Sequence, residues 1–371
     1  MVKQDLVLLS EPIHVYYFTG LKAAIEPQFD FSMKRNPIFL GMYREGQMFL
    51  LAGRSSLANP FLTDELMFDS KRLFDGSLWT YGDYDLDERV VARMDFVAEE
   101  LSEVVAEMKS RGRSGLEDVG IEEWHLQHEV TARLLKEFPS IKFSGISGPL
   151  EEIRVIKDEA EKNSIAEGMR RLKFVLERAD SFVVPGATEI EALQRLKGRM
   201  TMEYGEGAIM DGQILSGERT SEVFGRATRK KLEAGERAIL DLYTNIGGYW
   251  ARQAATIRVG SGAAMETDLE ARVRDALETG ERAFVAGARA GDVFGGISER
   301  LSKAGKNPGL VHEAGHGVGL ELQEEPFLIP NSGRVISEGM VCVLMAGLYT
   351  GSSGVRLSDC FAVRKTGSIK L

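Results

Sequence analysis

The sequence predicts an α/β protein of two domains. We expect a mixed N-terminal domain over residues 1–150 and a C-terminal domain over residues 151–371. Three observations predict this division. A chain of 371 residues is long enough for about two domains. Short β-type runs alternate with stretches of helical periodicity, and the turn-rich segment Phe143–Pro149 is typical of a domain boundary.

The N-terminal domain contains three short apolar runs that are typical of strands, at Val7–Leu9, Ile38–Met42 and Met48–Ala52. A longer stretch, Asp95–Met108, predicts a helix because its apolar residues recur at helical spacing. Strands and helices mixed in this way predict an α/β domain.

The C-terminal domain begins with two helices that the sequence marks by capping boxes. Asp158 and Glu161 are three residues apart, which is the spacing of a capping box. In a capping box, each of the two side chains accepts a hydrogen bond from the backbone N–H of the other residue. Thr188 and Glu191 repeat this pattern. The residues that form an apolar stripe after the first box are Ile165, Met169, Leu172 and Leu176.

A third helix is expected to begin near Thr267 or Asp268, and a fourth to follow Ala290–Asp292. The apolar residues expected on the inner face of the third helix are Leu269, Val273, Ala276 and Leu277. The β-type segments lie at 213–217, 237–260, 318–323 and 339–363. This order of elements predicts a sheet that is backed by pairs of helices.

Composition excludes several classes of function. The net charge is −10 and the Lys and Arg residues are scattered, so we expect no nucleic-acid partner. No apolar run approaches the ~18 residues of a membrane span, and the N-terminus lacks the pattern of a signal peptide. Both cysteines, Cys342 and Cys360, are expected to be reduced and buried. We therefore expect a cytoplasmic protein without a membrane partner.

The segment Val311–Leu320 contains a literal H-E-x-x-H pattern, formed by His312, Glu313 and His316. In zinc proteases this pattern lies on one face of a helix. Here a glycine stands at every second position from 315 to 319, and each interior glycine costs a helix about 1 kcal/mol relative to alanine. The alternation predicts a strand that other backbone approaches closely, and it opposes a helical zinc site.

Several motifs in order along the chain resemble one enzyme family. They are Asp5–Leu9, Ile13–Gly20, Arg154–Glu161, Pro185–Glu191, Asp241–Gly260, Gly315–Gly319, Gly339–Val341 and Gly354–Arg356. Together these motifs resemble the prolidases, aminopeptidases P, methionine aminopeptidases and creatinase. The resemblance implies a creatinase/prolidase-type N-terminal domain and a C-terminal pita-bread domain, in which a curved antiparallel sheet is backed by helices.

The resemblance also implies five positions for metal ligands. In the metallopeptidases of this family, two divalent cations are held by two Asp, one His and two Glu. Asp241 stands at the first Asp position and His316 at the His position. The second Asp falls on Arg252, and the two Glu positions fall on Met345 and Ser358. Only two of the five ligands are present.

Two adjacent dications need several hard oxygen ligands, and these residues do not supply them. Arg252 adds a positive charge, and two unit charges about 4 Å apart repel each other by about 4 kcal/mol at an effective dielectric constant near 20. We therefore predict no resident cofactor. The alternative is a single divalent ion that is bound by Asp241 and His316. We further expect the guanidinium group of Arg252 to take the place of a cation and pair with Asp241.

Other positions of the expected pocket are also assigned through the resemblance. The His that assists peptide hydrolysis falls on Gln323, and an upstream substrate-binding His falls on Phe224. Arg356 matches an Arg of the family, and Glu324 matches its acidic residue after the His. His312 is a further candidate for substrate binding. With Arg252, these residues predict a pocket for a small molecule or a short peptide.

Three functions fit these observations. The first is metal-free hydrolysis of a small C–N compound, by resemblance to creatinase, with His316 as proton shuttle oriented by Asp241 or Glu324. Arg252 would then favour an anionic or neutral substrate. The second is a non-catalytic binding protein, and the third is a metal-dependent Xaa-Pro aminopeptidase or dipeptidase. The resemblance also implies a homodimer.

Overall fold

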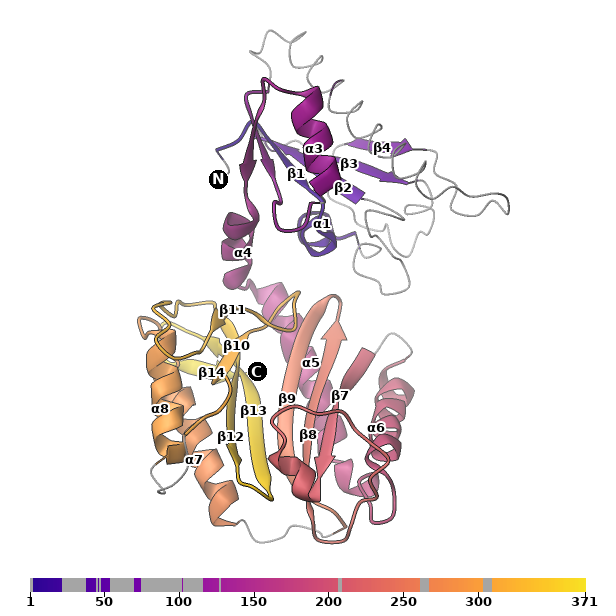
Figure 1. The fold of residues 1–371 in the computed structure, drawn as a ribbon, viewed down its shortest axis with the longest axis vertical. Helices are drawn as coiled ribbons and strands as arrows, with labels where there is room; N and C mark the ends of the chain where they lie inside the picture. The colour runs from indigo at the N-terminus through magenta and orange to yellow at the C-terminus, as the bar shows by residue number, and fades with distance from the viewer. Residues whose placement is uncertain are drawn as a thin grey trace, which may run out of the picture. The chain divides into compact units, whose positions relative to one another are not determined.

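The computed structural model describes most of the C-terminal half of the chain and separate stretches of the N-terminal half (Figure 1). The described residues are 3–21, 38–44, 46, 48–53, 70–74, 102, 116–126, 128–205, 209–260, 267–302 and 309–371. The chain divides into two compact units, Met1–Glu151 and Glu152–Leu371. Each unit is described by itself below.

The described part of the N-terminal unit is built on a six-stranded sheet with the order β4-β3-β2-β1-β5-β6. β1 pairs antiparallel with β2 and parallel with β5. The strands are β1 (Leu6–Leu9), β2 (Ile38–Tyr43), β3 (Met48–Gly53), β4 (Ser70–Phe74), β5 (Asp118–Ile121) and β6 (Lys142–Gly145). The helices here are α1 (Pro12–Thr19) and α3 (His128–Glu137). All three predicted strands are confirmed as β1, β2 and β3.

Two further predictions for the N-terminal part have different outcomes. The predicted helix Asp95–Met108 lies, apart from residue 102, outside the described residues. The turn-rich segment 143–149 was predicted to mark a domain boundary, and it lies close to the division of the two units between Glu151 and Glu152, but it is not a loop. Phe143 lies in β6, and Ser147 begins α4 (Ser147–Val155). Pro149 is tolerated in α4 because the N–H groups of a first helical turn have no partner within the helix.

The C-terminal unit contains an eight-stranded sheet whose described pairs are antiparallel. The order is β11-β10-β12-β13-β9-β8-β7, and β14 pairs with β13. The strands are β7 (Ile209–Ser216), β8 (Arg237–Ile246), β9 (Tyr249–Arg258), β10 (Gly315–Gly317), β11 (Glu324–Phe327), β12 (Val341–Tyr349), β13 (Gly354–Val363) and β14 (Ser368–Lys370). Three of the four predicted β-type segments are confirmed, within β7, β8–β9 and β12–β13.

Helices cover this sheet in two groups (Figure 1). Their bounds are α5 (Glu159–Leu176), α6 (Glu189–Tyr204), α7 (Asp268–Ala283) and α8 (Ala290–Ser302), with short 3-10 helices at Ala179–Ser181 and Gly217–Ser221. The capping boxes expected at Asp158 and Thr188 are present, and Thr267 forms a third one. The four predicted helices of the C-terminal domain are therefore confirmed.

Two apolar cores join the helices to the sheet. One core combines residues of α5 and α6 with residues of β7, β8 and β9, including Leu172, Leu196 and Leu240. The other combines α7 and α8 with β12 and β13, including Val273 and Leu344. The first core also reaches β12 and β13 through residues such as Val343 and Cys360. The helices themselves pack in pairs, α5 and α6 against β7, β8 and β9, and α7 and α8 against β12 and β13, so the sheet is backed by pairs of helices, as the sequence predicts.

The strand predicted at 318–323 is wrong. The strand β10 ends at Gly317, the chain bends over residues 319–323, and β11 begins only at Glu324. An added Cβ at Gly317 would lie 2.1 Å from the carbonyl oxygen of Glu325, so the glycine permits this tight reversal. Glu321 lies in this bend, so no strand passes through it.

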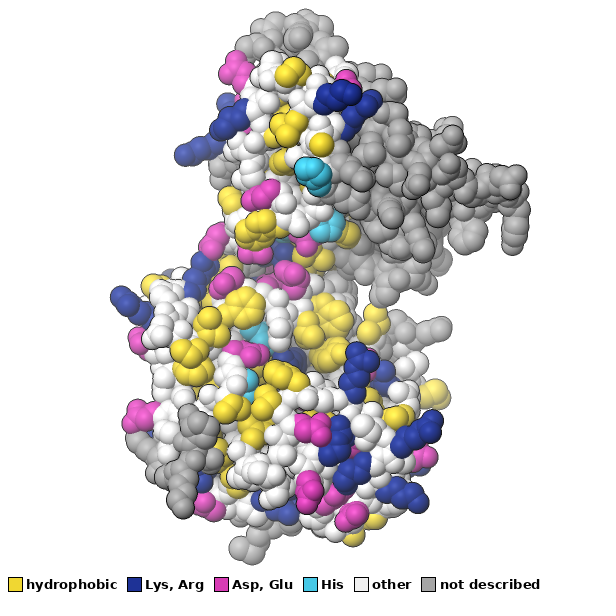
Figure 2. Space-filling model, viewed as in Figure 1, with side chains coloured by type: hydrophobic (Ala, Val, Ile, Leu, Met, Phe, Trp, Pro, Cys, Tyr) yellow, Lys and Arg dark blue, Asp and Glu magenta, His cyan; other side chains and the backbone are white. Residues whose placement is uncertain are grey.

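Charged side chains of both signs are interspersed on the face of the described residues that Figure 2 shows. This agrees with the scattered Lys and Arg residues of the sequence. None of the helices in the described part of the chain is both long and apolar enough to cross a bilayer.

A buried ionic cluster holds the start of α1 against the end of β5 in the N-terminal unit. Glu122 accepts hydrogen bonds from the backbone N–H groups of Ser10 and Glu11 through Oε2. Its Oε1 lies 2.5 Å from Nδ1 of His14, which also lies 3.0 Å from the carboxylate of Glu11. Burial lowers the pKa of His14, but hydrogen bonds to the two carboxylates outweigh burial and raise the pKa to about 9.

We expect His14→Gln to lower the free energy of unfolding by about 1–3 kcal/mol at pH 6, because it leaves a buried carboxylate without its charged partner. The contribution of His14 is fully present below the ordinary histidine pKa of 6.5 and is lost as pH rises through the folded-state pKa of about 9. Urea unfolding at pH 6 and pH 9.5, expressed relative to wild type, measures this difference. The exposed His125 supplies the control His125→Gln, and an equal effect of both variants would contradict the assignment.

Candidate functional site

Asp241 and Arg252 form a buried ion pair on the sheet of the C-terminal unit. Asp241 lies on β8 and Arg252 on β9, and both side chains are almost fully buried. Nε of Arg252 donates to Oδ1 of Asp241 at 2.8 Å, and Nη2 donates to Oδ2 at 2.7 Å. The planar guanidinium group thus binds both carboxylate oxygens at once. The ion pair expected from the sequence is present.

A second guanidinium group, that of Arg356 on β13, binds the same carboxylate. Its Nη1 donates to Oδ2 of Asp241 at 2.8 Å, and its Nη2 donates to the carbonyl oxygen of Val223. Burial alone would raise the pKa of Asp241, but the hydrogen bonds and charges of Arg252 and Arg356 lower it. Asp241 is therefore an ionised carboxylate that is held by two cations.

His316 lies on β10 and is fully buried beside this ion pair. Its Nδ1 lies 2.9 Å from the carbonyl oxygen of Gly317, so Nδ1 carries the proton and donates it. Nη1 of Arg252 lies 3.2 Å from Nε2 of His316, which accepts the hydrogen bond. Burial and the charge of Arg252 lower the pKa of His316 to about 4. The imidazole is neutral, and to act as a proton shuttle it would first have to lose the hydrogen bond from Arg252.

The two positions expected to carry Glu ligands lie in the same row of the sheet. Ser358 on β13 is paired with Met345 on β12 and with Ala254 on β9, and Ala254 is paired with Asp241. The hydroxyl oxygen of Ser358 accepts a hydrogen bond from the N–H of Ala254 at 2.7 Å. Met345 is 2% exposed and belongs to an apolar core. Neither side chain offers a carboxylate to a cation.

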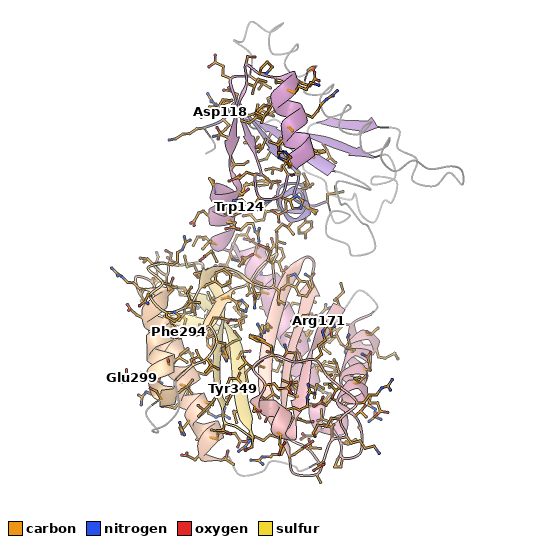
Figure 3. All side chains as sticks on the ribbon, viewed as in Figure 1. Asp118, Trp124, Arg171, Phe294, Glu299 and Tyr349 are labelled. Atoms are coloured by element: carbon orange, nitrogen blue, oxygen red, sulfur yellow. The ribbon has the colours of Figure 1, made fainter. Side chains whose placement is uncertain are left out.

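Tyr349 and His312 extend the cluster, and the role of Tyr349 was missed from the sequence. Nε of Arg356 donates to the hydroxyl of Tyr349 at 2.7 Å, and this hydroxyl lies 3.1 Å from Nε2 of His312. Tyr349 is labelled in Figure 3. Nδ1 of His312 lies 2.7 Å from the carbonyl oxygen of Glu313. His312 is thus joined to Asp241 through Tyr349 and Arg356. Tyr349 has no local sequence signal, since its contact arises from the pairing of β12 with β13.

Glu324 is held by a separate set of cations. Nη2 of Arg154 donates to its Oε2 at 2.7 Å, and the ammonium group of Lys157 binds its Oε1. Lys157 is fully buried, and Arg154 also binds Glu321 at 2.7 Å. Within the described residues, these cations and the N–H of Glu321 bind the Glu324 carboxylate, and His316 does not. In the sequence, Arg154 and Lys157 belong to the motif Arg154–Glu161, which did not indicate that they bind Glu324.

The remaining two predicted residues are exposed. The side chain of Phe224 is 60% exposed, and its ring centre lies 5.7 Å from the guanidinium carbon of Arg356. Gln323 is exposed in the bend before β11, and no hydrogen bond joins it to the cluster in the part of the chain that the structure describes. Phe224 therefore borders the ionic cluster, whereas Gln323 does not contact it.

These residues do not fit a pair of divalent cations. Both oxygens of Asp241 already bind guanidinium groups, and the lone pair on Nε2 of His316 accepts a hydrogen bond from Arg252. Two dications would lack the hard oxygen ligands that they require. Among the described residues, the only group of three or more His, Cys, Asp or Glu close enough to share one ion is Glu11, His14 and Glu122 of the N-terminal unit.

Comparison with known proteins identifies relatives of the whole chain. The sequence pattern of the family described as Metallopeptidase family M24 matches residues 163–365, and that of the Creatinase/Prolidase N-terminal domain matches residues 3–156. The chain is 27% identical over 238 residues to an Xaa-Pro dipeptidase of Pyrococcus furiosus, covering 64% of this chain and 68% of the relative. It is 22% identical over 367 residues to an Xaa-Pro dipeptidase of Lactobacillus helveticus, covering 98% and 91%.

Solved structures show the same fold. The structure of an X-Pro aminopeptidase from Thermotoga maritima superposes with a TM-score of 0.79 at 20% identity, covering 99% of this chain and 93% of that chain. The prolidase from Pyrococcus furiosus gives a TM-score of 0.77 at 22% identity, covering 99% and 96%. The expected fold, an N-terminal α/β domain followed by a sheet backed by helices, is confirmed.

We expect Asp241→Asn to lower the free energy of unfolding by about 3–5 kcal/mol, because it leaves two buried guanidinium groups without their counter-charge. In wild type this contribution is present above the unfolded pKa of about 4 and is lost as pH falls through the lowered folded pKa. Urea unfolding at pH 7 measures the first effect, and unfolding at pH 3, below the unfolded pKa, measures the second. Asp180→Asn, at an exposed position, is the control, and equal losses in the two variants would refute this account.

Proposed function

The chain belongs to metallopeptidase family M24, and we propose that it acts without the family's pair of metal ions, as a binding protein for a small molecule or a short peptide. One observation carries this proposal. Arg252 lies between Asp241 and His316 and uses the carboxylate and imidazole lone pairs that a metal would need.

The same geometry argues against acid–base catalysis by these residues. A general base needs a free lone pair and a pKa near the working pH. Both oxygens of Asp241 accept hydrogen bonds from guanidinium groups, and the pKa of His316 is lowered to about 4. Metal-free hydrolysis with His316 as proton shuttle is therefore the less favoured form of the proposal, and binding without turnover is the favoured one.

The charge of the cluster favours an anionic or neutral ligand. Two guanidinium groups, of Arg252 and Arg356, face one carboxylate, and the neighbouring His316 is neutral. A cationic ligand would meet this excess of positive charge in a region of low dielectric constant. The negative charge of Glu313 interacts with Arg252 at longer range and partly offsets the excess of positive charge.

The second candidate function is a metal-dependent Xaa-Pro dipeptidase or aminopeptidase. It is favoured by the names of the relatives, several of which are Xaa-Pro dipeptidases. In this chain it would require Arg252 to leave the cluster and an ion to bind with Asp241 and His316 as its only ligands among the five family positions. The homodimer and the cytoplasmic location expected from the sequence stay predictions.

The number of bound metal ions separates the two candidates. After incubation with excess Mn, Co or Zn and removal of loosely held ions, elemental analysis is expected to give well below one ion per chain. Hydrolysis of an Ala-Pro dipeptide by the same samples is expected to equal the protein-free blank. One or two tightly held ions together with turnover would overturn the proposal and favour the dipeptidase.

Arg252→Asp tests whether Arg252 itself excludes metal. The substitution removes the competing cation and introduces a carboxylate beside Asp241 and His316, so that three neighbouring side chains become available as ligands. We expect calorimetric titration with Mn or Co to detect binding by Arg252→Asp and none by wild type. Arg229→Asp makes the same change of charge at an exposed loop position and is the control. Equal metal binding by Arg252→Asp and Arg229→Asp would exclude this role of Arg252.

A further inference from the structure

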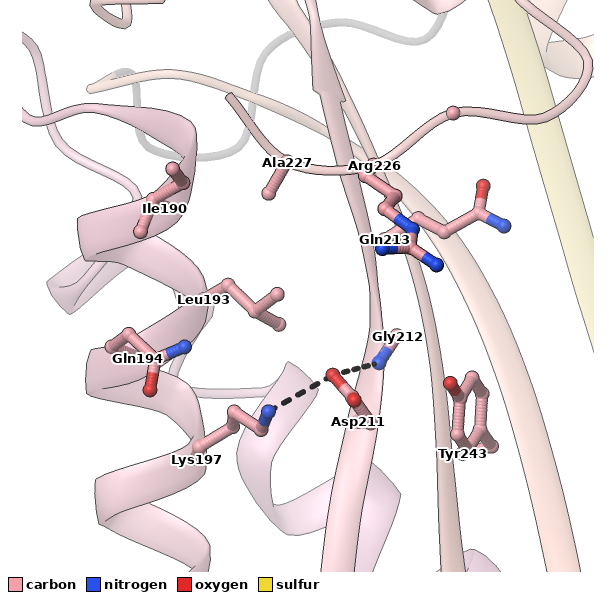
Figure 4. Close-up of a pocket in the computed structure, with 11 residues that line it drawn as sticks. Ile190, Leu193, Gln194, Lys197, Asp211, Gly212, Gln213, Arg226, Ala227 and Tyr243 are labelled. Atoms are coloured by element: carbon pink, nitrogen blue, oxygen red, sulfur yellow. Dashed lines mark hydrogen bonds and ion pairs between the residues drawn. The ribbon is translucent and has the colours of Figure 1, made fainter. Parts of the chain in front are cut away.

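A pocket with a volume of about 450 Å³ lies between α6 and the strands β7 and β8 (Figure 4). The loop 225–227 closes it on another side. Pockets of this size hold small organic ligands. Two pairings place the pocket next to the ionic cluster, since Gln213 of its lining is paired with Asp241 and Tyr243 is paired with Arg252. The pocket is thus a separate cavity that borders the cluster.

Three polar groups of the lining have no partner in the described part of the chain. The guanidinium group of Arg226 is exposed and forms no ion pair or hydrogen bond there. The side-chain oxygen of Gln213 is buried and accepts no hydrogen bond. The hydroxyl of Tyr243 has no hydrogen-bond partner there either. A buried acceptor without a donor is unusual in a folded protein and calls for a group that supplies one.

The rest of the lining is electrically neutral or apolar. Lys197 and Asp211 lie 3.0 Å apart and neutralise each other. Ile190, Leu193 and Ala227 form an aliphatic wall. Within the residues that the structure describes, the pocket therefore offers a free cation, a free acceptor and an apolar surface.

We propose that this pocket binds a small zwitterion with an aliphatic side chain, such as a free aliphatic amino acid. The carboxylate of the ligand pairs with Arg226, and its side chain contacts Ile190 and Leu193. Its ammonium group donates to the side-chain oxygen of Gln213 after that buried oxygen turns toward the pocket. The hydroxyl of Tyr243 donates a second hydrogen bond to the carboxylate. This inference rests on the proposed function, that the chain binds a small ligand without metal, and adds the place and the chemical class.

Calorimetric titration of the full chain with L-leucine tests the proposal. Two probes that each lack one charged group, 4-methylpentanoate and isopentylamine, are expected to bind at least tenfold more weakly than leucine. No binding of leucine at millimolar concentration, or equal binding of all three molecules, would overturn the proposal. A bound metal ion in wild type would overturn the proposed function and leave this result unchanged, so the two failures are distinguishable.

Variants assign the binding to the pocket. We expect Arg226→Ala and Tyr243→Phe to weaken leucine binding, the first at least tenfold, while Arg229→Ala in the same loop leaves it unchanged. Gln213→Leu is expected to weaken the binding of leucine but not of 4-methylpentanoate, which lacks the ammonium group. Equal effects of Arg226→Ala and Arg229→Ala would show general charge attraction and contradict a built site.

Discussion

The buried carboxylate of Asp241 is the group on which the candidate site depends. An ionised carboxylate inside a protein is tolerated only when cations and hydrogen bonds replace the water it has lost. Arg252 and Arg356 supply both, and they come from two different strands, β9 and β13. One side chain of β8 thus fixes two guanidinium groups, and through Arg356 it also fixes Tyr349 and His312.

The exchange of metal for guanidinium lowers the number of negative and positive charges in the centre together. In the metallopeptidase pattern, four carboxylates balance two dications, whereas in this chain the one carboxylate at Asp241 binds the guanidinium groups of Arg252 and Arg356, which leaves one positive charge in excess. Met345 and Ser358 offer no carboxylate, so this chain lacks the acidic ligands together with the metal ions that they would hold. The three substitutions are therefore physically consistent with one another, since buried carboxylates are costly without the metal ions that offset their charge.

The sequence predicts those parts of the molecule that rest on local spacing. Capping boxes such as Asp158–Glu161 depend on neighbouring residues, and the pair Asp241–Arg252 depends on one hairpin, so both could be anticipated. The contacts of Tyr349 and the binding of Glu324 by Arg154 and Lys157 could not, because they join segments that are far apart in the chain. The bend at 319–323 was missed because a glycine-rich alternation fits both a strand and a close backbone reversal.

His316 illustrates why a residue at a metal-ligand position does not by itself indicate a metal. The carbonyl oxygen of Gly317 binds Nδ1 and leaves the lone pair of Nε2 directed into the site. That tautomer suits a metal ion and a guanidinium donor equally well, since each needs a nitrogen lone pair. What decides between them is the residue opposite, and here it is Arg252, whose Nη1 lies 3.2 Å away. The chemistry of the site therefore follows from position 252 more than from the histidine.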